Sequence, residues 1–176
     1  MKIVLIGCGI AGYTAAKTLR EKLPSSEITL IDGGTHGLYS RMRLPETLAG
    51  TLPEQKLILA SPETIENSGI RFLAGVEAVS IQAQEKTLTL ADSRILSYDR
   101  LVLATGAEPS VPPIEGARTD MTLRSIEDVQ RYIKLLKAGA RATVIGGGLL
   151  GLEAAHALRE RGMKVAIAEF MPRLLP

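Results

Sequence analysis

The sequence of 176 residues has no tryptophan, a single cysteine, and aromatic side chains at only 3% of positions. One cysteine excludes a disulfide within the chain and is typical of a reducing compartment, so we expect a cytoplasmic protein. Few aromatic rings leave little surface on which bases could stack, and the net charge is only +2, so we predict no nucleic-acid partner. No apolar run approaches the roughly 18 residues of a membrane span, and we predict no membrane insertion.

The composition that remains is that of an ordinary globular protein, with 45% hydrophobic and 23% charged residues. The length suffices for one full domain or for one domain and a fraction of a second. The informative feature is the placing of the glycines, because two groups of them each follow an apolar run directly.

The first 32 residues have the pattern of a dinucleotide-binding unit. An apolar run over 2–6, rich in β-branched residues, predicts a strand, and the first glycine turn (Gly7–Gly12) follows at once. A helical pattern then extends to about Leu23, and a second apolar run over 27–31 stops at Asp32. Strand, glycine turn, helix, strand and acid in this order predict a site for a dinucleotide.

Each part of this unit has a physical role. Gly7 permits a tight turn, Gly9 lets backbone N–H groups approach a pyrophosphate, and Gly12 lets the helix pack closely on the sheet. Asp32 lies 20 residues past Gly12, where a carboxylate can accept hydrogen bonds from ribose hydroxyls. Taken alone, the glycine pattern also fits an ordinary turn in an α/β core. Cys8 is interpreted as a small half-buried residue rather than a redox group.

The same unit recurs near the end of the sequence. A strand is predicted over 141–145, the second glycine turn (Gly146–Gly151) follows, and a helix and a strand lead to Glu169, 18 residues past Gly151. The repetition is much more specific than either copy. In this copy the three glycine roles fall on Gly146, Gly148 and Gly151.

The segment between the two units predicts further elements. Short helices are expected over 44–50 and 61–69. Three short alternating segments predict an antiparallel β-meander, at 76–81, 87–90 and 95–98. A buried strand over 101–104 leads into a proline-rich linker over 107–120, which places a domain boundary near Pro112. Ser125 is predicted to cap a helix that ends near 137, with Asp128 at its third position.

Three blocks of this sequence resemble a known family: 3–32, the stretch 98–109 (Tyr-Asp-Arg-Leu-Val-Leu-Ala-Thr-Gly-Ala-Glu-Pro), and 144–153. They are similar to the FAD/NAD(P)-dependent pyridine nucleotide-disulfide oxidoreductases, which are flavoproteins with two dinucleotide sites. Within that family, 37–41 and 48–50 are most similar to ferredoxin and rubredoxin reductases and to the flavoprotein part of NADH-dependent nitrite reductases.

The resemblance implies an α/β fold with two parts. Residues 1–111 would form the first part of a Rossmann-type FAD-binding domain with an inserted β-meander, and 112–176 the first βαβ of a second, NADH-binding Rossmann-type domain. The implied function is that of an oxidoreductase in which FAD accepts hydride from NADH. The electrons would then pass to an acceptor protein or redox centre, and a homodimer is one expected state.

The resemblance also implies site residues. Those on the FAD side are Gly7, Gly9, Ala11, Gly12, Asp32, Arg41, Ala78, Ala104, Thr105, Gly106 and Arg124. Those on the NADH side are Gly146, Gly148, Leu149, Leu150, Gly151 and Glu169. Glu153 would stand beside the nicotinamide as the one candidate catalytic residue. Two isolated histidines are too few for a metal cluster, and no metal is expected.

The sequence departs from the family in three ways. Residues 40–50 contain no cysteine, which disfavours thiol chemistry, and Pro45 stands where ferredoxin reductases often carry a lysine. The family continues for about as many residues again, so we expect inefficient turnover by these residues alone, with apolar sheet surface at Val102 and Leu103 left partly uncovered.

The alternative to an oxidoreductase is a nucleotide-binding fragment or sensor without turnover. A scaffold using only the first glycine turn is disfavoured by the repeat.

Overall fold

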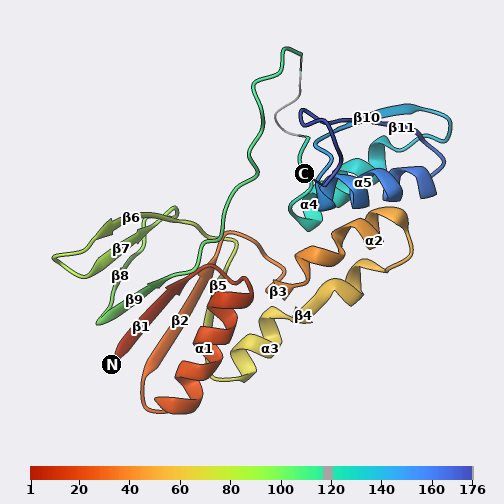
Figure 1. The fold of residues 1–176 in the computed structure, drawn as a ribbon. Helices are drawn as coiled ribbons and strands as arrows, with labels where there is room; N and C mark the ends of the chain where they lie inside the picture. The colour runs from red at the N-terminus through yellow and green to blue at the C-terminus, as the bar shows by residue number, and fades with distance from the viewer. Residues whose placement is uncertain (117–120, 176) are drawn as a thin grey trace. The chain divides into compact units, whose positions relative to one another are not determined.

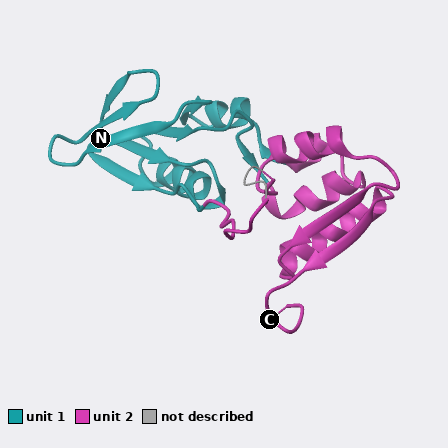
Figure 2. Ribbon diagram, turned by 90° about the horizontal axis from the view of Figure 1, so that it is seen from above, with its two compact units in different colours: residues 1–39, 58–107 teal, residues 40–57, 108–176 magenta. Residues whose placement is uncertain are grey.

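The computed structural model describes residues 1–116 and 121–175, so residues 117–120 of the predicted linker lie outside the described part. The chain forms two compact units (Figure 2): residues 1–39 with 58–107, and residues 40–57 with 108–176. The boundary near residue 107 lies close to the predicted one. Residues 40–57, however, pack with the second unit, whereas the predicted ranges group them with the first.

The first unit is built on a parallel sheet of four strands in the order β5-β2-β1-β9. The strands are β1 (Lys2–Ile6), β2 (Glu27–Asp32), β5 (Arg71–Ala74) and β9 (Arg100–Leu103). Their parallel pairing brings the carboxyl ends of all four to one edge of the sheet. The first glycine turn lies at that edge, between β1 and helix α1 (Ile10–Lys22).

Both faces of this sheet are covered, as Figure 1 shows, with α1 on one face and a β-meander on the other. Successive strand residues point to opposite faces, so Ile3 and Leu5 pack on the α1 side whereas Val4 and Ile6 pack on the meander side. The near-continuous apolar runs of β1 and β2 follow from this burial on two sides.

The predicted meander is confirmed. Its strands are β6 (Ala78–Gln82), β7 (Thr87–Leu90) and β8 (Ile95–Ser97), paired antiparallel in that order. Leu88 and Leu90 are fully buried against the sheet. The strand predicted over 101–104 forms as β9. Val102 is half-buried and Leu103 is 63% exposed, so the strand is not fully buried, and the expectation that both residues are left partly uncovered is confirmed.

The remaining elements of the first unit are short: β3 (Leu38–Tyr39), β4 (Ile58–Ala60) and α3 (Pro62–Asn67). The side chain of Ser61 caps α3 as predicted, because it accepts a hydrogen bond from the backbone N–H of Thr64 (3.1 Å). Strands β3, β4 and β5 were not predicted, because β3 and β4 have only two and three residues and β5 (Arg-Phe-Leu-Ala) does not alternate between polar and apolar side chains.

The second unit combines helices with a two-stranded parallel sheet. Its main elements are α4 (Ile126–Leu135), β10 (Arg141–Ile145), α5 (Leu149–Glu160) and β11 (Lys164–Ala168). Residues 40–57 contribute α2 (Leu44–Ala49) and the single turns η1 (Arg41–Arg43) and η2 (Glu54–Leu57), and α2 lies against α4 and α5. The predicted capping box of α4 is confirmed, since Ser125 and Asp128 each accept the other's backbone N–H.

Candidate nucleotide-binding sites

The first glycine turn begins with a conformation that requires glycine. Gly7 has φ of 103°, in the left-handed region, and its N–H donates to the carbonyl of Ile31 (2.8 Å). A Cβ at this position would overlap the carbonyl oxygen of Ala104, which follows β9. The turn is therefore fixed between the ends of β1, β2 and β9.

Gly9 and Gly12 are needed for different reasons. A Cβ at Gly12 would overlap the carbonyl oxygen of Gly7, so this glycine permits α1 to pack directly on the turn. At Gly9 a Cβ would meet no protein atom within 4 Å, and φ of −77° is open to any residue. The space beside Gly9 is thus free for a group that is not protein.

The carboxylate of Asp32 faces the first glycine turn. Its Oδ2 accepts the backbone N–H of Cys8 (2.5 Å) and its Oδ1 accepts that of Gly34 (2.7 Å). Cys8 is only 2% exposed, more buried than the predicted half-buried residue. Asp32 itself is half-buried, and each of its oxygens keeps a lone pair for a further donor such as a ribose hydroxyl.

The second glycine turn repeats this geometry. Gly146 has φ of 102° and donates to the carbonyl of Ala168 (2.8 Å), the counterpart of the Gly7 bond. Gly148 has no protein atom within 4 Å of a Cβ, and a Cβ at Gly151 would overlap the carbonyl oxygen of Gly146. The second turn differs from the first at its first glycine. A Cβ at Gly146 would meet open space, whereas one at Gly7 would overlap Ala104, because β10 pairs only with β11 among the described strands.

Glu169 occupies the place that Asp32 has in the first unit. Its Oε2 accepts the N–H of Gly147 (2.5 Å) and its Oε1 that of Met171 (2.8 Å). These hydrogen bonds from backbone amides, that of Met171 foremost, lower the pKa of Glu169 below its usual value. The carboxylate is therefore firmly ionised at neutral pH.

The helices that follow the two turns share a property that sets them apart. Neither α1 nor α5 has a side-chain cap or an acidic residue in its first turn. By contrast, α3 and α4 each have a serine cap and acidic residues there. Uncapped N–H groups and the positive end of the helix dipole favour an anion, so both turns suit a phosphate group.

The other predicted FAD-side residues of the first unit lie in or near this turn or in the meander. Ala104 donates its N–H to the carbonyl of Ile6 (2.8 Å) and touches the turn, and the exposed Thr105 and Gly106 follow it at the carboxyl edge of the sheet. Ala11 is exposed in the first turn of α1, and Ala78 is half-buried at the start of β6.

The structure brings two predicted arginines together in the second unit. Nη1 of Arg41 donates to the backbone carbonyl of Arg124 (3.2 Å). The N–H of Arg124 in turn donates to Oδ2 of Asp128 (2.7 Å), and Oδ1 of Asp128 pairs with Nη2 of Arg131 (2.6 Å). The sequence indicated Asp128 as part of a helix cap but not its bond to Arg124, which lies just before the cap residue Ser125.

The predicted NADH-side residues lie on and around α5. Leu149 and Leu150 are 64% and 62% exposed at its start, beside the second glycine turn. Glu153 is half-buried and lines a pocket of about 230 Å³ between α5 and the α2 segment. No sequence pattern indicates this pocket, because its walls are more than 100 residues apart in the chain. Its lining residues are Met42, Pro45, Glu46, Ala49, Thr51, Glu153, His156, Ala157 and Glu160.

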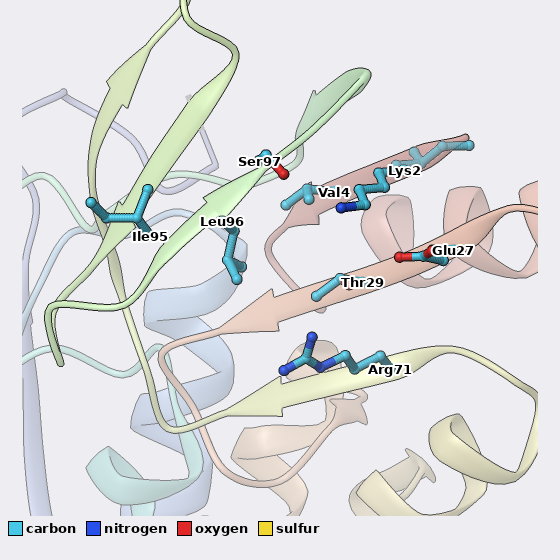
Figure 3. A pocket seen from close by; sticks show the side chains of 9 residues that line it. Lys2, Val4, Glu27, Thr29, Arg71, Ile95, Leu96 and Ser97 are labelled. Atoms are coloured by element: carbon cyan, nitrogen blue, oxygen red, sulfur yellow. The ribbon is translucent and has the colours of Figure 1, made fainter.

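A second pocket lies in the first unit, between the sheet and β8 (Figure 3). Its volume is about 220 Å³, and its polar walls include Lys2, Glu27 and Arg71. Lys2 and Glu27 begin β1 and β2, so this pocket is at the amino ends of those strands. Ligands of open parallel sheets bind at the carboxyl ends, so the pocket is separate from the glycine turn.

Two further properties concern metals and membranes. Within residues 1–116 and 121–175, no three side chains of His, Cys, Asp or Glu are grouped so that they could hold a metal ion. No helix in this part of the chain combines the length and apolar character needed to cross a bilayer.

This chain is similar to known oxidoreductases over nearly its whole length. The large subunit of nitrite reductase (NADH) from Escherichia coli K12 is 34% identical over 179 residues, covering 99% of this chain and 21% of that protein. The ferredoxin–NAD(+) reductase component of the p-cumate 2,3-dioxygenase system from Pseudomonas putida is 35% identical, covering 99% of this chain and 44% of that protein. This chain thus spans less than half the length of these relatives.

A solved structure has the same fold over the whole of this chain. The NAD-dependent persulfide reductase from A. fulgidus matches all of this chain and 35% of its own, with a TM-score of 0.93 and 33% identity. The sequence model of the pyridine nucleotide-disulphide oxidoreductases matches residues 1–176. The Rossmann-type α/β fold predicted from the sequence is confirmed. The chain belongs to the family of pyridine nucleotide-disulphide oxidoreductases.

Proposed function

We propose that this chain binds FAD at the first glycine turn and NADH at the second, and that it serves an oxidoreductase that transfers electrons to an acceptor. The observation that carries the proposal is the doubled site: two uncapped helix N-termini, each with an open space at the middle glycine and an acid facing the turn. On this proposal residues 1–111 contribute to FAD binding and residues 112–176 to NADH binding.

The residues of the first turn fit the ADP half of FAD. The space beside Gly9 and the free N–H groups of α1 suit the pyrophosphate, and Asp32 has lone pairs left for the ribose hydroxyls. When bound, FAD accepts a hydride from NADH and gives up its electrons to an acceptor. Arg41 and Arg124, which the resemblance also assigns to FAD, lie together in the second unit.

The residues of the second turn fit NADH in the same way. Gly148 leaves room for the pyrophosphate, and the ionised Glu169 accepts from the ribose 2′-hydroxyl while it repels a 2′-phosphate. Glu153, four residues into α5 and in the pocket wall, orients the nicotinamide end. The exposed Leu149 and Leu150 exclude water from the bound dinucleotide.

The acceptor that we propose is a protein or a redox centre of the nitrite reductase, ferredoxin or rubredoxin type. The names of the E. coli and P. putida relatives support it, as does the absence of cysteine from residues 40–50. A cytoplasmic location and a homodimer complete the proposal.

The test is reduction of the flavin by NADH. Purified protein should be yellow, and anaerobic NADH should bleach the visible absorbance of the bound flavin. A second candidate function is that of a nucleotide-binding module without turnover. Protein that binds both nucleotides but is not bleached would establish that second function instead.

A further inference from the structure

Helix α2 cannot be stable by itself. It has six residues, far fewer than an isolated helix needs in water, and four of them are buried. It lies against α4 and α5 (Figure 1), where Leu44 and Leu48 are each only 1% exposed. The position of α2 is therefore set by its contacts within the second unit.

One polar contact fixes the carboxyl end of α2. Nε of Arg161 donates to the carbonyl of Leu48 (2.7 Å), 113 residues away in sequence. Carbonyls in the last turn of a helix have no partner within the helix, and a cation is favoured there, so Arg161 completes α2 from outside. Gly162, with φ of 78°, follows Arg161 and ends α5, so the arginine extends from a fixed point.

Gly50 makes this contact geometrically feasible. It ends α2 with φ of 87°, and a Cβ there would come to 2.8 Å from Nη2 and 2.9 Å from Cζ of Arg161. A side chain at position 50 would push the guanidinium away from Leu48. Gly50 and Arg161 thus act as one fastening, which joins the end of α2 to the end of α5.

This fastening joins the ends of the two helices, α2 and α5, that contribute the walls of the pocket containing Glu153. One wall of the pocket is formed by the α2 segment, with Pro45 and Glu46, and the other by α5, with Glu153 and His156. The second glycine turn is at the amino end of α5, and Glu153 is the residue of the pocket on α5 nearest to that turn. The proposed function therefore places the nicotinamide of a bound dinucleotide at this end of the pocket. Displacement of α2 would change the wall opposite Glu153 and leave the glycine turn as it is.

We propose that Arg161, together with Gly50, is a positioning residue for NADH, which holds α2 at the correct distance from Glu153 without touching the nucleotide. The inference rests on the proposed function, because it takes NADH to bind at the second glycine turn with its nicotinamide toward Glu153. It predicts an effect on the nicotinamide end alone, and none on the adenosine diphosphate end.

The experiment compares two ligands, NADH and ADP-ribose, which lacks the nicotinamide. Arg161→Ala should raise the Kd of NADH by about fivefold or more, as expected when a positioning hydrogen bond is lost, and leave the Kd of ADP-ribose unchanged. Arg159→Ala is the matched control, because it removes the same charge from the last turn of α5 at an exposed position. It should change neither constant.

Two further variants keep the test decisive. Gly50→Ala should weaken NADH in the same selective way, and combining it with Arg161→Ala should add nothing, because both break one fastening. Arg161→Lys, which can still donate to Leu48, should restore part of the NADH affinity and serves where Arg161→Ala does not fold.

Each other outcome has a distinct meaning. Equal weakening of NADH and ADP-ribose would show that Arg161 only stabilises the fold, and unchanged NADH affinity in folded Arg161→Ala would show that it positions nothing. Unaltered protein that binds NADH no more tightly than ADP-ribose would leave no nicotinamide contact to position and would overturn the inference. Unaltered protein that binds neither ligand would overturn the proposed function itself.

Discussion

Replacing Gly9 by valine should weaken FAD binding strongly without disturbing the fold. A Cβ at Gly9 meets no protein atom within 4 Å, and the backbone has φ of −77° and ψ of −177°, which valine adopts without strain. Valine is a poorer helix N-cap than glycine, but it restricts the unfolded chain, so the net change in stability should stay within about 1 kcal/mol. Any large effect must therefore come from a ligand.

The expected loss of affinity follows from the space that the side chain fills. A phosphate can approach the backbone N–H groups only where no side chain intervenes. A charge-assisted hydrogen bond contributes about 1.5–3 kcal/mol, so losing one raises the Kd of FAD about 10- to 150-fold. The assay is titration of apoprotein with FAD, followed by quenching of flavin fluorescence, with thermal unfolding measured in parallel.

Two other glycines provide the controls. Gly148→Val has the same open surroundings in the second turn and should weaken NADH while FAD binding is kept. Gly12→Val should instead unfold the first unit, because its Cβ would overlap the carbonyl oxygen of Gly7. Folded Gly9→Val protein with full flavin occupancy would refute the assignment of FAD to the first glycine turn.

Three more predictions concern charge and capping. The unaltered chain should bind NADH more tightly than NADPH, because repulsion between the Glu169 carboxylate and a 2′-phosphate costs on the order of a few kcal/mol. Glu169→Ala should reduce the difference between the two Kd values. Equal affinities in the unaltered chain would contradict this prediction. The amides of Met171 and Gly147 lower the pKa of Glu169, so the stabilisation from the ionised Glu169 is fully present above the usual carboxyl pKa and is lost only as pH falls through the lowered pKa. The preference for NADH should therefore persist in mildly acidic buffer, which is checked by measuring the Kd values of NADH and NADPH against pH. Ser125→Ala should lower the free energy of unfolding measured in urea by about 1 kcal/mol, and Asp128→Ala should lower it by more, because Asp128 also forms an ion pair with Arg131. Equal losses for the two variants would argue against a contribution from that ion pair.

The sequence by itself determined the two glycine turns and the meander. The turn at Gly7 depends on a left-handed backbone angle and on a strand that ends just before it, and both are properties of neighbouring residues. The meander follows from short alternating segments separated by turns, and the cap at Ser125 from a spacing of three residues. Such features depend on local chemistry, so they can be predicted without the fold.

The tertiary structure alone decided where residues 40–57 lie and what they touch. In chain order α2 lies between β3 and β4 of the first unit, but its buried leucines pack against α4 and α5 of the second unit. The contacts of Arg161 with Leu48 and of Arg41 with Arg124 join residues about 80 to 110 positions apart, and no local pattern marks them. Burial of apolar surface is non-directional, so the sequence shows that α2 must be covered but only the fold decides by which helix.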